Sequence, residues 1–236
     1  AQRVDLLDDQ LEGLSGATPA DVVAVAQRAA TRDLRVTHVL SEVLRVLEGR
    51  PAPTAELEDL RRRLSAYVAA GGHRRDRNRD GFYDEPMAAV VDNAWKPLVE
   101  AVFGEVLGGY LASPDRRPEG LDDPPSSYGS AFDASAWYSL VVRELRRVFD
   151  GAPRPDGVPA MCGGGSPDRC ADALWAALRR GRWLTAQQQP FAGDPDRWVR
   201  PTFGELIRFI PFVTNTATMR WTNRPTWQQV IQFRAG

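Results

Sequence analysis

Along most of this chain the hydrophobic positions recur every three or four residues, which predicts amphipathic helices rather than strands. Several predicted helices begin at a threonine or serine N-cap, as at Thr18 and Thr54, and glycines or prolines mark their ends. The predicted helices cover, in order, 3–14, 18–49, 54–71, 86–110, 135–149 and a segment that Ser166 caps.

The later part of the chain follows a different pattern. Residues 112–135 are rich in proline, glycine and serine, which predicts a long loop without regular structure. The sequence turns polar from Trp183, and apolar residues return over 203–212. Thr226–Phe233 is β-branched and aromatic without a helical stripe, which predicts a strand whose partners lie outside this chain. We therefore expect one α+β region, predominantly α: helical over 1–182 and mixed over 203–236, with a terminal strand.

Composition narrows the class of protein. The 236 residues are 43% hydrophobic and carry a formal net charge of −1, so the chain can bury one substantial core. This charge balance favours neither a nucleic-acid partner nor an acidic membrane surface. No apolar run is long enough to span a bilayer, so we expect no membrane partner.

The segment 76–84 has acidic and amide side chains at a spacing with a chemical meaning. If Asp76 is taken as the first position, the pattern follows the first nine places of an EF-hand calcium loop, with Gly81 at the turn. The expected calcium ligands are Asp76, Asn78, Asp80, the carbonyl of Phe82, and Asp84.

The last position of the EF-hand pattern does not match, because the twelfth residue is Met87 instead of a bidentate glutamate. Glu85, Asp92 or water would have to complete the oxygen shell. The alternative is a solvated turn whose side chains bond to their own backbone. We expect no organic cofactor.

Cys162 and Cys170 are the only cysteines, eight positions apart across a glycine-rich turn. We interpret them as a disulfide, which implies an oxidising, extracytoplasmic compartment. A redox pair and two inert thiols are the competing interpretations, although a redox pair would be expected at C-x-x-C spacing.

Four stretches in one order resemble the penicillin acylase family of N-terminal nucleophile hydrolases. They are Arg3-Val4 at the start of the first helix, Thr18-Pro-Ala-Asp followed by Gln27, Thr31, Arg32, Asp33 and Leu34, the Asp-rich loop leading to Trp95, and the closing Trp221-Thr-Asn-Arg-Pro-Thr. The similarity covers most of the chain and corresponds to the later part of the β-chain. A pair such as Cys162 and Cys170 is typical of secreted actinobacterial members.

The resemblance implies the C-terminal portion of a four-layer αββα fold, with the remaining α- and β-chain segments of the same precursor as partners. It also implies that the nucleophile, which begins the family's β-chain, lies upstream of Ala1. The family arginine that orients groups around the nucleophile and substrate falls on Arg3. The family's known structural calcium is held outside the region that resembles this chain.

Two functions of different classes follow. The first is part of a secreted amidase that removes the acyl group of a small molecule, such as a β-lactam, an acyl-homoserine lactone or a lipopeptide. The second is a catalytically silent, calcium-binding helical module or pseudoenzyme. The segment that precedes Ala1 in the source protein distinguishes the two functions. The amidase requires that this upstream segment begin with Ser, Thr or Cys.

Overall fold

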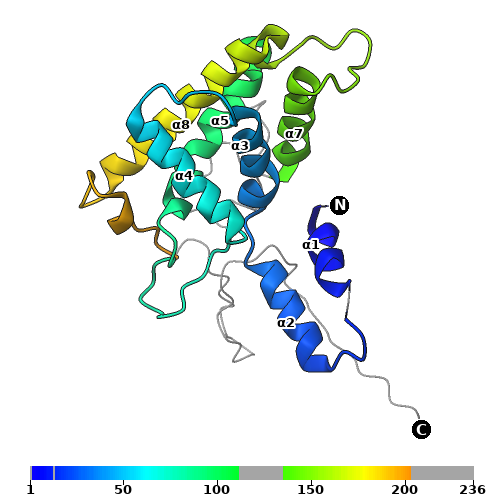
Figure 1. The fold of residues 1–236 in the computed structure, drawn as a ribbon, viewed down its shortest axis with the longest axis vertical. Coiled ribbons are helices and arrows are strands. Elements are labelled where there is room, and N and C mark those ends of the chain that lie inside the picture. The colour runs from blue at the N-terminus through cyan, green and yellow to red at the C-terminus, as the bar shows by residue number, and fades with distance from the viewer. Residues whose placement is uncertain (1, 13, 112–134, 203–236) are drawn as a thin grey trace, which may run out of the picture.

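The computed structural model of the protein describes residues 2–12, 14–111 and 135–202, and these residues form helices and no strand. The α-helices are α1 (Gln2–Leu11), α2 (Pro19–Ala30), α3 (Ser41–Leu47), α4 (Ala55–Ala69), α5 (Met87–Leu111), α7 (Ser135–Phe149) and α8 (Pro167–Gln188) (Figure 1). A π-helix, η1 (Arg35–Leu40), and two 3-10 turns, η2 (Cys162–Gly165) and η3 (Pro195–Arg197), complete them. The expected predominance of helix is confirmed for these residues. The predicted loop over 112–134 and the predicted strand Thr226–Phe233 lie outside them.

Helices α5 and α8 form the centre of the core, and they contact each other more extensively than any other pair of elements. They approach closely at Gly181 of α8, where an added Cβ would lie 2.4 Å from the Cβ of Ala94 on α5. Only glycine permits this crossing, because real Cβ atoms do not come so close. Helix α7 packs on α3 and α5, and α4 packs on α3 and α8. None of the described helices is both long and apolar enough to cross a membrane.

Helices α1 and α2 form an arm beside this core. They pack on each other, and Figure 1 shows them apart from the body that α3, α4, α5, α7 and α8 build. A side-chain bond links them, since Nε of Arg28 donates to Oε1 of Gln10 over 2.8 Å. Thr18 caps α2 as expected and forms a capping box with Asp21. The arm thus places the end of α2 close to the start of η1.

The prediction of one helix over 18–49 is wrong, because the chain leaves the helix between Thr31 and Leu34. The amide of Asp33 donates to the carbonyl of Gly72 over 2.8 Å, and the amide of Arg74 donates to the carbonyl of Thr31 over 2.7 Å. These bonds to a distant segment replace two helical ones. Gly72 has φ +60°, and a Cβ there would lie 2.7 Å from Cγ1 of Val36, so glycine is required at this contact.

Helix α8 continues past the point where the sequence turns polar. Thr185 is completely buried, and its hydroxyl donates to the carbonyl of Gly181 over 2.8 Å. The side-chain amide of Asn93 on α5 donates to the same hydroxyl over 3.1 Å and to Oε1 of Gln188 over 3.0 Å. Thr185 therefore faces α5 instead of solvent, while Gln188 bonds to Asn93 at an exposed position, and the helix ends at Gln188 rather than near residue 182.

Candidate functional site

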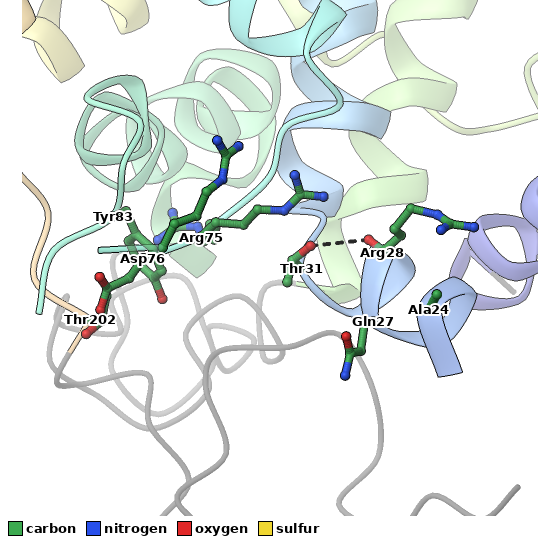
Figure 2. Close-up of a pocket in the computed structure, with 10 residues that line it drawn as sticks. Ala24, Gln27, Arg28, Thr31, Arg75, Asp76, Tyr83 and Thr202 are labelled. Carbon is green, nitrogen blue, oxygen red and sulfur yellow. Dashed lines mark hydrogen bonds between the residues drawn. The ribbon is translucent and has the colours of Figure 1, made fainter. Parts of the chain in front are cut away.

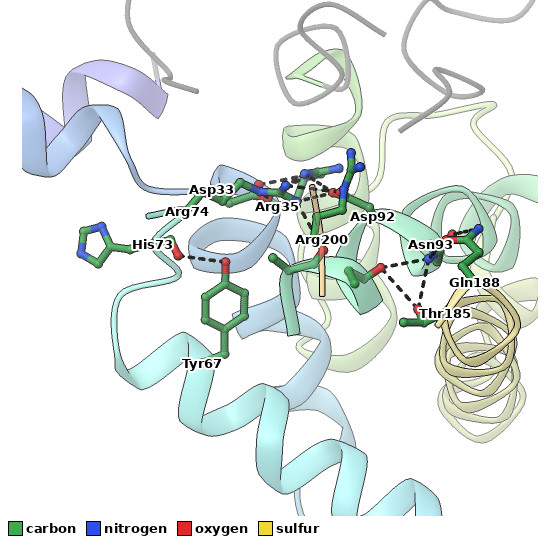
Figure 3. Close-up of polar contacts among 12 residues, drawn as sticks. Asp33, Arg35, Tyr67, His73, Arg74, Asp92, Asn93, Thr185, Gln188 and Arg200 are labelled. Atoms are coloured by element: carbon green, nitrogen blue, oxygen red, sulfur yellow. Dashed lines mark hydrogen bonds and ion pairs between the residues drawn. The ribbon is translucent and has the colours of Figure 1, made fainter. Parts of the chain in front are cut away.

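Five charged side chains from four separate parts of the chain meet at the base of the arm (Figure 3). Asp33 and Arg35 lie in one segment, at the break after α2 and in η1. Arg74 follows α4, Asp92 lies on α5, and Arg200 lies at the end of the described chain. Nη2 of Arg35 donates over 2.7 Å both to Oδ2 of Asp33 and to Oδ1 of Asp92. Nε of Arg74 donates to Oδ2 of Asp33 over 2.9 Å, and both Arg74 and Arg200 pair with Asp92. Asp33, Arg35, Arg74 and Arg200 are buried, and the side chain of Asp92 is only 5% exposed.

The charges in this arginine–aspartate cluster depend on one another. Burial alone would raise the pKa of Asp33, but Arg35 and Arg74 outweigh burial and hold that pKa below its ordinary value. The pKa of Asp92 is likewise lowered, because Arg74, Arg35 and Arg200 outweigh the effect of burial. Both carboxylates are therefore ionised near neutral pH. A buried network of this kind loses much stability when one partner is removed, since the remaining charges stay buried.

A pocket of about 390 Å³ borders the cluster between α2 and the segment 74–83. This volume lies within the usual range for small-molecule sites. Figure 2 shows residues of α2 and Thr31 at one end of the pocket, and Asp76, Tyr83 and Thr202 at the other. The lining residues are Ala24, Gln27, Arg28, Thr31, Arg74, Arg75, Asp76, Arg77, Tyr83 and Thr202. Among these described lining residues four are arginines and one is an acid, so this part of the lining carries more positive than negative charge.

A chain of hydrogen bonds ties the pocket arginine Arg75 to the break after α2. Nη2 of Arg75 lies 3.2 Å from Nε2 of His73, and Nδ1 of His73 lies 2.9 Å from Oγ1 of Thr31. The hydroxyl of Thr31 donates to the carbonyl of Arg28 over 3.3 Å. Burial first, and then Arg75, Arg32 and Arg77, lower the pKa of His73 to about 4. His73 is therefore neutral at physiological pH.

This arrangement does not activate Thr31 as a nucleophile. Because a guanidinium can only donate, Nε2 of His73 is the acceptor, and the proton of the neutral ring sits on Nδ1, facing Thr31. A general base would need the opposite tautomer, with a free lone pair toward the hydroxyl. The low pKa of His73 weakens it further as a base. Thr31 and His73 thus hold the pocket wall in place.

The predicted calcium loop forms turns stabilised by its own side chains. Asn78 donates to Oδ2 of Asp80 over 2.9 Å, and Oδ1 of Asp80 accepts from the amide of Phe82 over 2.9 Å. Oδ1 of Asp84 accepts from the amide of Arg77 over 3.0 Å. The loop is also fastened to the end of the described chain, because the amide of Thr202 donates to the carbonyl of Gly81 over 2.8 Å.

The calcium residues do not converge in this arrangement. Over the described stretches, no three His, Cys, Asp or Glu side chains gather as a metal site would require, so Asp76, Asp80 and Asp84 would have to turn to share a cation. Asp92, one candidate to complete the shell, belongs to the arginine–aspartate cluster. Calcium binding at Asp76, Asn78, Asp80, Phe82 and Asp84 stays a prediction.

The expected disulfide is present between Cys162 and Cys170, with Cα atoms 5.0 Å apart, and both cysteines are fully buried. Glu144 of α7 supports the turn beside it. Its Oε1 accepts from the amide of Met161 over 2.8 Å, and its carboxylate pairs with Arg154 over 2.8 Å. No sequence signal indicates this second contact, because Glu144 looks like one more charged residue on an amphipathic helix.

Arg3, the site residue that the resemblance supplies, lies in α1, and its side chain is outside the described positions. Sequence reasoning missed the arginine–aspartate cluster and the role of His73. A signal for the cluster did exist, since Arg35 and Asp92 stand inside otherwise apolar helical faces. The sequence does not show which of these charged residues pair, because the partners lie up to 108 residues apart.

The chain was also compared with known proteins. Neither the protein-family models nor the curated proteins searched include a match to this sequence.

Proposed function

We propose that this chain is the later part of the β-chain of an N-terminal nucleophile amidase of the penicillin acylase type. The observation that carries the proposal is spatial. Two of the stretches that bear the resemblance are far apart in the sequence but meet at one pocket. Gln27 and Thr31 come from the stretch that begins at Thr18, and Asp76 comes from the Asp-rich loop. A third stretch begins α1, which packs on α2 beside this pocket.

In this proposal the chain is a scaffold, not the bearer of the nucleophile. Both cysteines are in the disulfide, Thr31 faces a protonated ring nitrogen, and the hydroxyl of Thr18, which donates to Asp21, belongs to the cap of α2. The nucleophile would be the first residue of an upstream segment, with its own α-amino group as base. Arg3 would orient the reacting groups from the start of α1. The disulfide favours an extracytoplasmic setting.

The substrate would be the amide of an acylated small molecule, such as a β-lactam, an acyl-homoserine lactone or a lipopeptide. The partners would be the other α- and β-chain segments of the precursor, which would also supply strands to pair with Thr226–Phe233. Calcium, if bound by the loop 76–84, would be structural.

Intact mass measurement and N-terminal sequencing of the processed source protein test the proposal. We expect a chain that contains these 236 residues and begins upstream of Ala1 with serine, threonine or cysteine. A mature chain that begins with any other residue would leave no N-terminal nucleophile and would favour the silent helical module.

A further inference from the structure

We propose that the pocket between α2 and the segment 74–83 binds a small organic carboxylate, with Arg75 as its principal ligand. This inference does not rest on amidase activity, because the residues that carry it are all present in this chain.

The charge of the pocket is unevenly compensated. Arg74 is paired with Asp33 and Asp92, and Arg77 lies 3.3 Å from Asp84. Arg75 bonds to a neutral histidine and Arg28 to a neutral glutamine, and neither pairs with a carboxylate of the described residues. Two guanidinium groups at one pocket therefore have no ion-pair partner among the described residues, and Asp76 is the one acid of the described lining.

The surroundings of Arg75 show the resulting repulsion. Burial and then Arg77 lower the pKa of Arg75, Asp84 raises it, and Arg32 and Arg28 lower it further. An anion bound beside Arg75 would relieve this repulsion, and it would do so in a half-buried place where charges interact more strongly than in water.

Arg75 is also held in a fixed orientation. Its bond to His73, which is itself bonded to Thr31, aims the side chain from the loop toward the end of α2 (Figure 2). The side chain of Arg75 is therefore already ordered in the free protein, so binding loses less conformational entropy. The planar guanidinium presents paired N–H groups that match the two oxygens of a carboxylate.

The rest of the lining indicates a ligand larger than an inorganic ion. The side-chain amide of Gln27 and the hydroxyl of Thr31 offer neutral hydrogen-bonding groups at one end. Ala24 and the ring of Tyr83 supply apolar surface, and a volume of about 390 Å³ exceeds what an inorganic anion fills. A carboxylate attached to an apolar body uses both parts of the pocket, so this is the class to which the proposal commits.

The test is calorimetric titration of the complete source protein with benzoate, with benzamide as the uncharged analogue and inorganic phosphate as the other anion. We expect saturable one-site binding of benzoate that weakens with added salt, and binding of benzamide at least about tenfold weaker. Phosphate binding without benzoate binding would overturn the choice of ligand, and the absence of saturable benzoate binding would overturn the site.

Variants locate the binding. Arg75→Gln should weaken benzoate binding by about tenfold or more, and Arg75→Lys, which keeps the charge but not the paired donors, by less. Arg28→Gln, at an exposed position of α2, gives a second reading if Arg75→Gln does not fold. The matched control is Arg62→Gln, an exposed arginine of α4 that does not line the pocket. Equal weakening by Arg62→Gln and Arg75→Gln would show a diffuse charge effect and contradict the proposal.

Discussion

Arg74 and Asp33 are 41 residues apart in the sequence, yet Nε of Arg74 donates to Oδ2 of Asp33 over 2.9 Å and neither side chain is exposed. This ion pair joins the break after α2 to the segment that follows α4. The ion pair adjoins the pocket, because Arg74 is also one of the residues that line the pocket. The pair therefore holds together the two segments that form the site.

Replacing Asp33 with asparagine should destabilise the protein by about 3–5 kcal/mol, because it leaves Arg35 and Arg74 buried with too little negative charge. Urea unfolding measures the change. The matched control is Asp168→Asn, where the carboxylate pairs with Arg50 but is 87% exposed, and little change is expected. Equal losses in the two variants would contradict a structural role for the cluster.

His73 should make stability depend on pH below neutrality. Its pKa is about 4 in the folded protein and about 6.5 when unfolded, so the unfolded state binds the proton more readily between these values. The contribution of neutral His73 to the free energy of unfolding is complete above pH 6.5 and is lost as pH falls toward 4. After allowance for partial exposure it is on the order of 1 kcal/mol.

Thermal melts between pH 6.5 and 4.5 measure this effect, and His73→Gln should flatten the slope in that window. Loss of stability below pH 4 should persist in the variant, because the lowered pKa values of Asp33 and Asp92 act there. An identical slope for both proteins across the window would assign the effect elsewhere.

Two glycines in neighbouring helices should respond in opposite directions to alanine. Gly181→Ala should destabilise by about 1–3 kcal/mol, because the new Cβ would meet Ala94 and force α8 away from α5. Gly104→Ala in α5 meets nothing within 4 Å and should stabilise by about 0.5–1 kcal/mol through helix propensity. Chemical denaturation measures both. A stabilising Gly181→Ala would contradict the close crossing of these helices.

Calcium should raise the melting temperature if the loop 76–84 binds it, since a ligand of the folded state stabilises that state by mass action. Asp80→Ala should abolish the response, because Asp80 is central to the loop and its carboxylate bonds the amide of Phe82. No shift with calcium or with chelator, together with no bound calcium by elemental analysis, would identify the loop as an ordinary turn.

Local signals in the sequence predicted much of the fold, and long-range pairing accounts for what they missed. The caps at Thr18, Thr54 and Ser166 are confirmed, as is the disulfide, because caps and a short glycine-rich loop depend on neighbouring residues. The break after Thr31 depends on Gly72, and the burial of Thr185 depends on α5. Neither partner is visible from a local window.

The candidate site was predictable only in part. The sequence singled out Asp76 and its neighbours by their spacing, but it gave no reason to connect them with Gln27 and Thr31 except the family resemblance. The pocket exists because the break after α2 bonds to the segment 72–74, which is a tertiary event. Its arginines were individually visible, whereas their gathering was not.

The proposed amidase function predicts activity only in the complete, processed protein. The measurement is hydrolysis of a panel of chromogenic acyl amides by that protein, by residues 1–236 alone, and by the complete Arg3→Ala variant. We expect hydrolysis by the complete protein, none by the isolated residues, and turnover lowered about 10²-fold in the variant with little loss of stability. Robust hydrolysis by the isolated 236 residues, or no hydrolysis of any amide by the complete protein, would contradict the account.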